Sequence, residues 1–257
     1  MKIRSAIVIA WLATSGTAIA EEYQSFTYLE YTTIDLDIVE VDLWLLGTSY
    51  FLSDRSTLGP LDQFTYINPI SNFGAAYADV DGNNQFVVGG EYFFDKIVVG
   101  AAASDDDGIE QVWVGYLFSE NFLASVEAVD EFDETEFYFA ARYQLKLEGN
   151  DYLGFSVRSD DGLDNLSFSS KYFRGLSNGR YLSIDASILD VTGGNFAAVD
   201  ASYYWTERTS ARAGLRTGGN VALGFKHFFN RSFLLEVDYE DMGGDGDSVS
   251  LILGAQF

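Results

Sequence analysis

The last ten residues of the chain alternate between apolar and polar side chains. In residues 248–257 (SVSLILGAQF) every second side chain is apolar, and Ile252 is the only large apolar residue at the positions between. A period of two places the apolar residues on one face of a strand and the small or polar ones on the other. The stretch ends on Phe257, and a strand of this kind with a terminal aromatic residue is typical of outer-membrane β-barrels.

The same alternation recurs along most of the chain, in segments of about 8–12 residues separated by turns. Glycine is frequent (25 residues), aromatic residues make up 16% of the chain, and there are only 2 prolines. This composition and pattern predict an all-β fold, a transmembrane antiparallel up-and-down β-barrel of about 16 strands. The expected strands span residues 23–33, 40–51, 70–79, 85–94, 96–104, 109–118, 122–129, 135–146, 152–158, 163–173, 181–189, 195–205, 208–216, 220–229, 232–240 and 248–257.

The turns between these segments are of two kinds that alternate along the chain. Most even-numbered strands are followed by tight links flanked by aromatic residues, such as residues 94–96 and 230–231. An up-and-down meander produces this alternation, because odd turns collect at one end of the barrel and even turns at the other. With both termini in the periplasm, the acidic turns would be extracellular. The acidic or glycine-rich turns span residues 35–37, 79–84, 105–108, 130–134, 159–162, 190–195, 217–220 and 240–247.

The first twenty residues resemble a secretory signal. Lys2 and Arg4 precede a short apolar run, and Ala18 and Ala20 place small residues where a signal peptidase reads. We therefore expect residues 1–20 to be a cleaved signal peptide and residues 21–257 to form a single barrel domain in the outer membrane of a Gram-negative bacterium. The chain has no cysteine, so backbone pairing and packing must hold this exported domain together.

The chain is strongly acidic, with a formal net charge of −24. The 15 Lys and Arg residues are too few for nucleic-acid binding, because a protein uses these side chains to displace counterions from phosphates. The acidic field instead attracts cations. The expected partners are outer-membrane lipid and lipopolysaccharide, together with small hydrophilic solutes and ions.

Charged residues on the expected strands fall on the face opposite the apolar one. A charge that faces lipid at mid-depth costs about 2–4 kcal/mol, so these side chains should face the barrel interior. Sixteen strands enclose more space than side chains fill, which predicts a water-filled pore; the alternative is that the charges only pair across the wall. The candidate pore-lining residues are Glu91, Glu127, Glu136, Arg142, Arg158, Lys171, Asp185, Asp200, Arg212, Arg216, Lys226, Glu236 and Asp238.

Residues 53–69 interrupt the repeating pattern. They contain Pro60 and are bounded by Pro69, the only two prolines, and proline cannot donate to a central ladder. We expect a longer periplasmic connection here, with room for a helical turn and too short to be a full plug.

No pattern of catalytic, cofactor-binding or metal-ligating residues stands out. His227 is the only histidine and shares a face with Val221 and Phe225, which favours a structural role over a catalytic one. Residues 79–83 resemble the start of a calcium loop, but position twelve is Gly90 and not glutamate. The aspartates of the acidic turns are expected to be solvated, with diffuse binding of divalent cations beside lipopolysaccharide as the alternative; these are Asp105, Asp106, Asp107, Asp245 and Asp247.

Several short motifs resemble the family of general bacterial porins of gammaproteobacterial outer membranes. They are residues 23–26 (YQSF), residues 58–61 (LGPL), residues 66–68 (YIN) and the terminal Phe257. The resemblance implies an outer-membrane porin that passes small hydrophilic solutes by passive diffusion, and the charge adds a weak preference for cations. A nonconducting structural or adhesive barrel and a soluble secreted β-protein are the alternatives. Whether the barrel is a homo-oligomer is left open.

Overall fold

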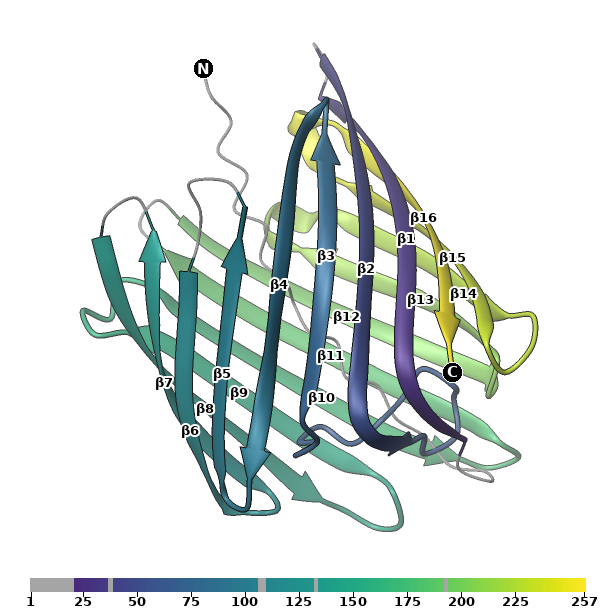
Figure 1. Cartoon of the computed structure of the whole chain (residues 1–257). Helices are drawn as coiled ribbons and strands as arrows, with labels where there is room; N and C mark the ends of the chain where they lie inside the picture. Colours follow the sequence, from purple (N-terminus) through teal and green to yellow (C-terminus); the bar gives the residue numbers. More distant parts are fainter. Residues whose placement is uncertain (1–20, 37–38, 106–109, 132–133, 192–193) are drawn as a thin grey trace.

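Sixteen antiparallel strands close into one barrel in the computed structural model (Figure 1). The structure describes residues 21–36, 39–105, 110–131, 134–191 and 194–257. The predicted fold class is therefore confirmed, and each expected segment overlaps one strand. The strands are β1 (Glu22–Leu36), β2 (Val39–Ser56), β3 (Asn72–Val80), β4 (Asn83–Phe94), β5 (Ile97–Ser104), β6 (Glu110–Ser119), β7 (Phe122–Glu131), β8 (Glu134–Lys146), β9 (Tyr152–Asp160), β10 (Leu166–Leu176), β11 (Arg180–Val191), β12 (Gly194–Thr206), β13 (Thr209–Arg216), β14 (Val221–Phe228), β15 (Phe233–Asp241) and β16 (Asp247–Gln256).

The barrel closes where the first strand meets the last. β1 pairs with β16 from Phe26–Gln256 to Asp35–Asp247, so neither strand leaves an unpaired edge. The carbonyl oxygen of Phe257 accepts the backbone N–H groups of Gln24 and Ser25, at 2.6 and 2.8 Å. The predicted strand at residues 248–257 is thus the element that joins the two ends of the sheet.

The strands turn their apolar faces outward. On β16, Leu251 and Leu253 are 43% and 49% exposed, and Leu215 on β13 is 59% exposed. Such a continuous apolar exterior belongs to a barrel that faces lipid. Among the described residues, no helix is long and apolar enough to cross a membrane.

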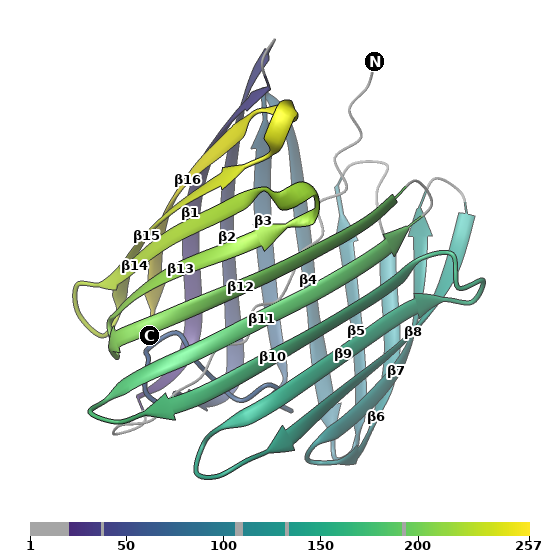
Figure 2. The same cartoon turned by 180° about the vertical axis from the view of Figure 1, so that it is seen from behind.

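The two kinds of turns lie at opposite ends of the barrel, as the alternation predicted (Figures 1 and 2). We call the end with the β3–β4 turn the acidic end, and the end where β1 begins and β16 finishes the terminal end. At the acidic end Asp81 and Gly82 both have positive φ, 51° and 81°, which suits a two-residue hairpin turn. Residues 1–20, the expected signal peptide, lie outside the described residues, as do residues 37–38, 106–109, 132–133 and 192–193.

The connection after β2 differs from the expectation. β2 continues to Ser56, and residues 57–71, here called the inner segment, form neither strand nor helix. Thr57, Leu61 and Phe64 are only 1–3% exposed, so the segment is packed inside the barrel. The predicted helical turn is wrong. The segment is long enough to cross the lumen because an extended chain gains about 3.3–3.6 Å per residue.

Candidate pore and the segment that crosses it

The inward face of β12–β15 carries a network of alternating charges. Arg212 lies between Asp200 (3.4 Å) and Asp238 (2.6 Å), and Arg216 lies between Asp200 (2.9 Å) and Glu240 (3.2 Å). Each guanidinium, on β13, therefore bridges Asp200 on the neighbouring β12 and a carboxylate on β15, across β14. Fork-shaped arginine groups suit such bridging because they present several donors in one plane.

Glycines make room for this network. Gly214 is paired with Asp200, and Gly224 is paired with both Arg212 and Asp238. A Cβ atom at Gly214 or Gly224 would lie 2.2 Å from the Oδ1 atom of Asp200 or Asp238. The carboxylates can lie against the wall, within reach of the arginines, only because these positions lack a side chain.

Two further ion pairs continue the charged face toward β7. Arg158 on β9 donates to Glu127 on β7 at 2.7 Å, and its guanidinium lies 3.5 Å from the ring centroid of Tyr138 on β8. Lys171 on β10 lies 3.4 Å from Asp185 on β11. The charged face therefore extends over roughly half of the barrel.

The inner segment crosses the terminal end from one side of the barrel to the other. It leaves β2 beside Glu21, whose carbonyl oxygen accepts the N–H of Thr57 at 2.9 Å. Leu61 then donates to the carbonyl of Glu207 in the β12–β13 turn, at 2.9 Å. Ile67 donates to Oε1 of Gln144 on β8, at 3.2 Å. The chain then returns to β3, so the segment spans the mouth of the barrel.

One ion pair ties the inner segment to the charged network. Lys226 on β14 lies 2.7 Å from Asp62 of the inner segment and 3.1 Å from Glu236 on β15. The side chains of Lys226 and Asp62 are only 20% and 10% exposed. Nε2 of Gln256 on β16 also donates to the carbonyl of Leu61, at 3.0 Å. The segment is therefore held by groups from three neighbouring strands.

An aromatic cluster holds the middle of the inner segment. The ring of Tyr66 lies over Gly154 on β9, where a Cβ atom would be 2.5 Å from the ring. Tyr66 packs against a buried cluster, and its ring centroid is 6.2 Å from that of Tyr152. Gln63 also donates from Nε2 to the hydroxyl of Tyr204. The cluster consists of Tyr152, Phe173, Tyr181 and Tyr204.

Arg55 holds the beginning of the inner segment against β1 and β2. Its guanidinium lies 4.4 Å from the ring centroid of Phe51, 4.3 Å from that of Phe64 and 5.4 Å from that of Phe26. Arg55 is buried and has no ion pair among the described residues. Cation–π contacts with three rings therefore take the place of a carboxylate.

The inward face of β2–β6 has a different composition. Between Val39 and Phe51 of β2, and along β3–β6, Glu91 is the only charged side chain on this face among the described residues. Asn72 donates to Glu91 from Nδ2, at 3.0 Å. Small residues dominate the rest of the face; they include Gly47, Gly74, Ala76, Ala78, Gly89, Gly100, Ala102 and Gly115.

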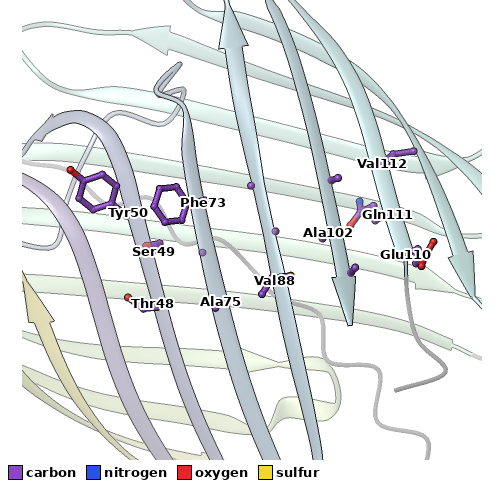
Figure 3. Close-up of a pocket in the computed structure, with 15 residues that line it drawn as sticks. Thr48, Ser49, Tyr50, Phe73, Ala75, Val88, Ala102, Glu110, Gln111 and Val112 are labelled. Atoms are coloured by element: carbon purple, nitrogen blue, oxygen red, sulfur yellow. The ribbon is translucent and has the colours of Figure 1, made fainter. Parts of the chain in front are cut away.

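The same strands carry a groove (Figure 3). Most of its lining side chains, among them Tyr50, Phe73, Val88 and Val112, belong to the exposed outer face. Between them lie small residues such as Ala75 and Ala101, which hollow the surface. β2–β6 therefore form a wall with small residues at many inward positions and large apolar side chains on its outer face.

The register places all thirteen candidate pore-lining residues on the inward face. Most of them are brought together in the ion pairs described above, which matches the alternative in which charges pair across the wall. Arg142 and Glu136 have no ion pair among the described residues, and Glu136 instead accepts a hydrogen bond from the hydroxyl of Tyr138 at 2.6 Å. A role for the thirteen in solute passage is a proposal that rests on this placement.

The sequence did not reveal the contribution of the inner segment to this site. Asp62 and Arg55 lie in the stretch without alternation, where no periodic signal assigns a face. The two prolines and the high content of Leu, Phe and Ile in residues 57–70 were the available hint of a buried segment.

The other residues weighed from the sequence have structural contacts. His227 faces outward, where Nδ1 lies 2.9 Å from the hydroxyl of Thr209. Asp79 accepts the N–H of Gly82 at 3.0 Å and so supports the β3–β4 turn. Among the described residues no three His, Cys, Asp or Glu side chains could together hold a metal ion. Asp106, Asp107 and the side chain of Asp245 lie outside the described part of the chain.

The family model described as "Putative general bacterial porin" matches residues 1–255. The chain belongs to this family. It is therefore an outer-membrane porin. A comparison with curated proteins finds no match.

Solved porin structures share the fold at low sequence identity. The outer membrane protein Omp33 of Acinetobacter baumannii is 14% identical with a TM-score of 0.61, over 92% of this chain and 99% of that one. A triple mutant of the Rhodopseudomonas blastica porin is 11% identical with a TM-score of 0.56, over 91% and 99% of the two chains. Both likenesses concern the fold alone.

Proposed function

We propose that the protein is a passive diffusion channel for small hydrophilic solutes, narrowed at its terminal end by the inner segment. The observation that carries the proposal is the placement of charged side chains on the inward face of a closed barrel of sixteen strands. A barrel of this size holds water unless it is plugged. The inner segment packs against β1 and β2 through Phe64, and against strands between β8 and β16 through residues 61–67. This leaves the β3–β6 side as the path for solutes.

A weak preference for cations accompanies this function. Glu30, Glu91 and Glu136 are inward carboxylates without an ion pair, whereas the inward basic side chains of the described strands that lack one are Arg142 and Arg55, and Arg55 is buried among three phenylalanine rings. The acidic turns add to this field. The preference should fade at 1 M salt, where the Debye length falls to about 3 Å.

A nonconducting structural or adhesive barrel is the second candidate. The burial of Leu61, Phe64 and Ile67, at 2–6% exposure, favours it, because a segment packed so well could close the mouth completely. The two candidate functions predict opposite results for ion conductance: the channel conducts ions and the structural barrel does not.

Residues 21–257, refolded and inserted into a planar bilayer, separate the two candidates. Stable conductance steps with a cation-sided reversal potential in a salt gradient are the expected result. Gly154→Ala should enlarge the steps, because its Cβ atom would push Tyr66 off the wall. Gly175→Ala is the matched control, since a Cβ atom there has no neighbour closer than 3.6 Å.

The outcomes distinguish the candidates directly. A folded barrel in which neither the wild type nor Gly154→Ala conducts would replace the channel by the structural role. Conductance by Gly154→Ala alone would mean that the inner segment is a complete plug. Equal permeability to cations and anions at low salt would remove the cation preference but leave the channel.

The proposal includes a signal peptide at residues 1–20 and an extracellular position for the acidic end, beside lipopolysaccharide. Mass spectrometry of the protein from purified outer membranes should find Glu21 as the first residue. Protease added to intact cells should cut at the acidic turns and spare the inner segment.

A further inference from the structure

We infer that this channel favours amphipathic solutes, meaning small molecules with an aromatic or aliphatic ring on one side and polar groups on the other. The inference rests on the proposed channel function and names its preferred solute class. Its basis is the juxtaposition of two unlike walls, the apolar inward face of β2–β6 and the charged inward face of β7–β15.

The apolar wall offers contact surface and few hydrogen bonds. Val87 on β4, flanked by Ala76 on β3, and Ala102 on β5, which faces Gly89, lie on its inward face. Aliphatic groups of this kind cannot replace the water that a sugar hydroxyl gives up, so a fully polar solute loses by touching them. An aromatic or aliphatic ring of a solute gives up no hydrogen bond at this wall, and its contact with the wall removes apolar surface from water.

Trp113 on β6 provides a flat platform on the same wall. Its indole lies against Gly100, where a Cβ atom would be 2.0 Å from Cε2 and Cζ2. Aromatic faces of this kind stack on flat solutes.

The charged wall supplies the polar side of the path. Glu127 and Tyr138 continue the row of Trp113 onto β7 and β8, and Arg158 joins them from β9. Arg142 is exposed and has no ion pair among the described residues, so its donors are free for a passing solute. A solute with two unlike sides can thus match both walls at once.

The experiment compares phenyl glucoside with glucosylglycerol, two neutral solutes of similar size, in a liposome-swelling assay with the refolded chain. The lumen variant is Ala76→Ser/Val87→Thr/Ala102→Ser, which makes the apolar wall polar with little change in volume. The matched control is Ala75→Ser/Val88→Thr/Ala103→Ser, which makes the same changes one residue away, on the outer face of the same strands.

We expect the wild type to pass phenyl glucoside faster than glucosylglycerol, and the lumen variant to reduce that ratio about threefold. The control variant should keep the wild-type ratio, and both variants should show the heat-modifiable migration of a folded barrel. Equal rates for the two solutes in the wild type, or the same loss of ratio in both variants, would overturn the inference. A wild type that passes arabinose but shows no preference overturns the inference alone, whereas a wild type that passes no arabinose overturns the channel itself.

Discussion

The two halves of this barrel wall are built on the same strand geometry and have opposite interiors. On β12–β15 three charged side chains, Asp200, Arg212 and Asp238, each face a glycine on the next strand. On β3–β6 small residues face other small ones, as Gly89 faces Ala102. A long charged side chain opposite a short one has room to form ion pairs along the wall. Two short side chains opposite each other leave open space in the lumen. The difference indicates that cross-strand partners, and not strand propensity, decide which side of the lumen stays free.

The largest expected effect comes from breaking the charged half at Lys226. Lys226→Met would leave the carboxylates of Asp62 and Glu236 buried without their cation. We expect a loss of about 3 kcal/mol in the free energy of unfolding, the lower end for a broken buried pair because lumen water reaches this one. Release of Asp62 should also raise the conductance, since the inner segment loses its ionic attachment. Urea unfolding in detergent and single-channel recording measure the two effects.

Lys146→Met is the control for Lys226→Met. Lys146 pairs with Glu120 at 2.8 Å, but the side chains are 52% and 76% exposed. An exposed pair contributes about 0–1 kcal/mol, so this variant should unfold close to the wild type. Equal losses in the two variants would show that burial of the Lys226 pair has no energetic meaning.

A smaller effect is expected where the charged half depends on a missing side chain. Gly224→Ala would place a Cβ atom 2.2 Å from Oδ1 of Asp238 and force it away from Arg212. Crowding of this kind costs about 1–3 kcal/mol. Thermal unfolding followed by gel migration measures the change, with Gly175→Ala as the uncrowded reference. A Gly224→Ala barrel as stable as that reference would mean that the ion pair can move without cost.

The sequence predicted the strands well because each has one face in lipid and one in the lumen, so the period of two recurs in the strand segments. The same reasoning placed Arg212, Asp200 and Asp238 on the inward face, since a charge toward lipid is costly. It did not show that they form one network, because pairing depends on register between strands. The register across β12–β15 is set by the turns, and the alternation of apolar and polar residues does not predict the geometry of those turns.

The inner segment could not be predicted in the same way. Residues 57–71 have no period, and their position depends on contacts with strands far away in the chain. Leu61 meets Gln256, and Ile67 meets Gln144. Arg55 is a further case, since an arginine in the polar run 53–57 (SDRST) gives no sign that three phenylalanine rings will surround it. Only tertiary structure brings these partners together.

The smallest expected effect concerns the one charge of the apolar half. Glu91→Gln keeps a side chain of the same shape whose amide oxygen can still accept from Asn72, so stability should hardly change. The cation-to-anion permeability ratio should fall by less than about fivefold, because a unit charge at 4 Å is worth only about 1 kcal/mol in water. Glu240→Gln is the comparison, since Arg216 already neutralises Glu240 in the charged half. Reversal potentials in a low-salt gradient measure both. If Glu240→Gln lowers the permeability ratio as much as Glu91→Gln, the charged half affects ion passage as strongly as the apolar half. The path of the ions would then not lie along the apolar wall.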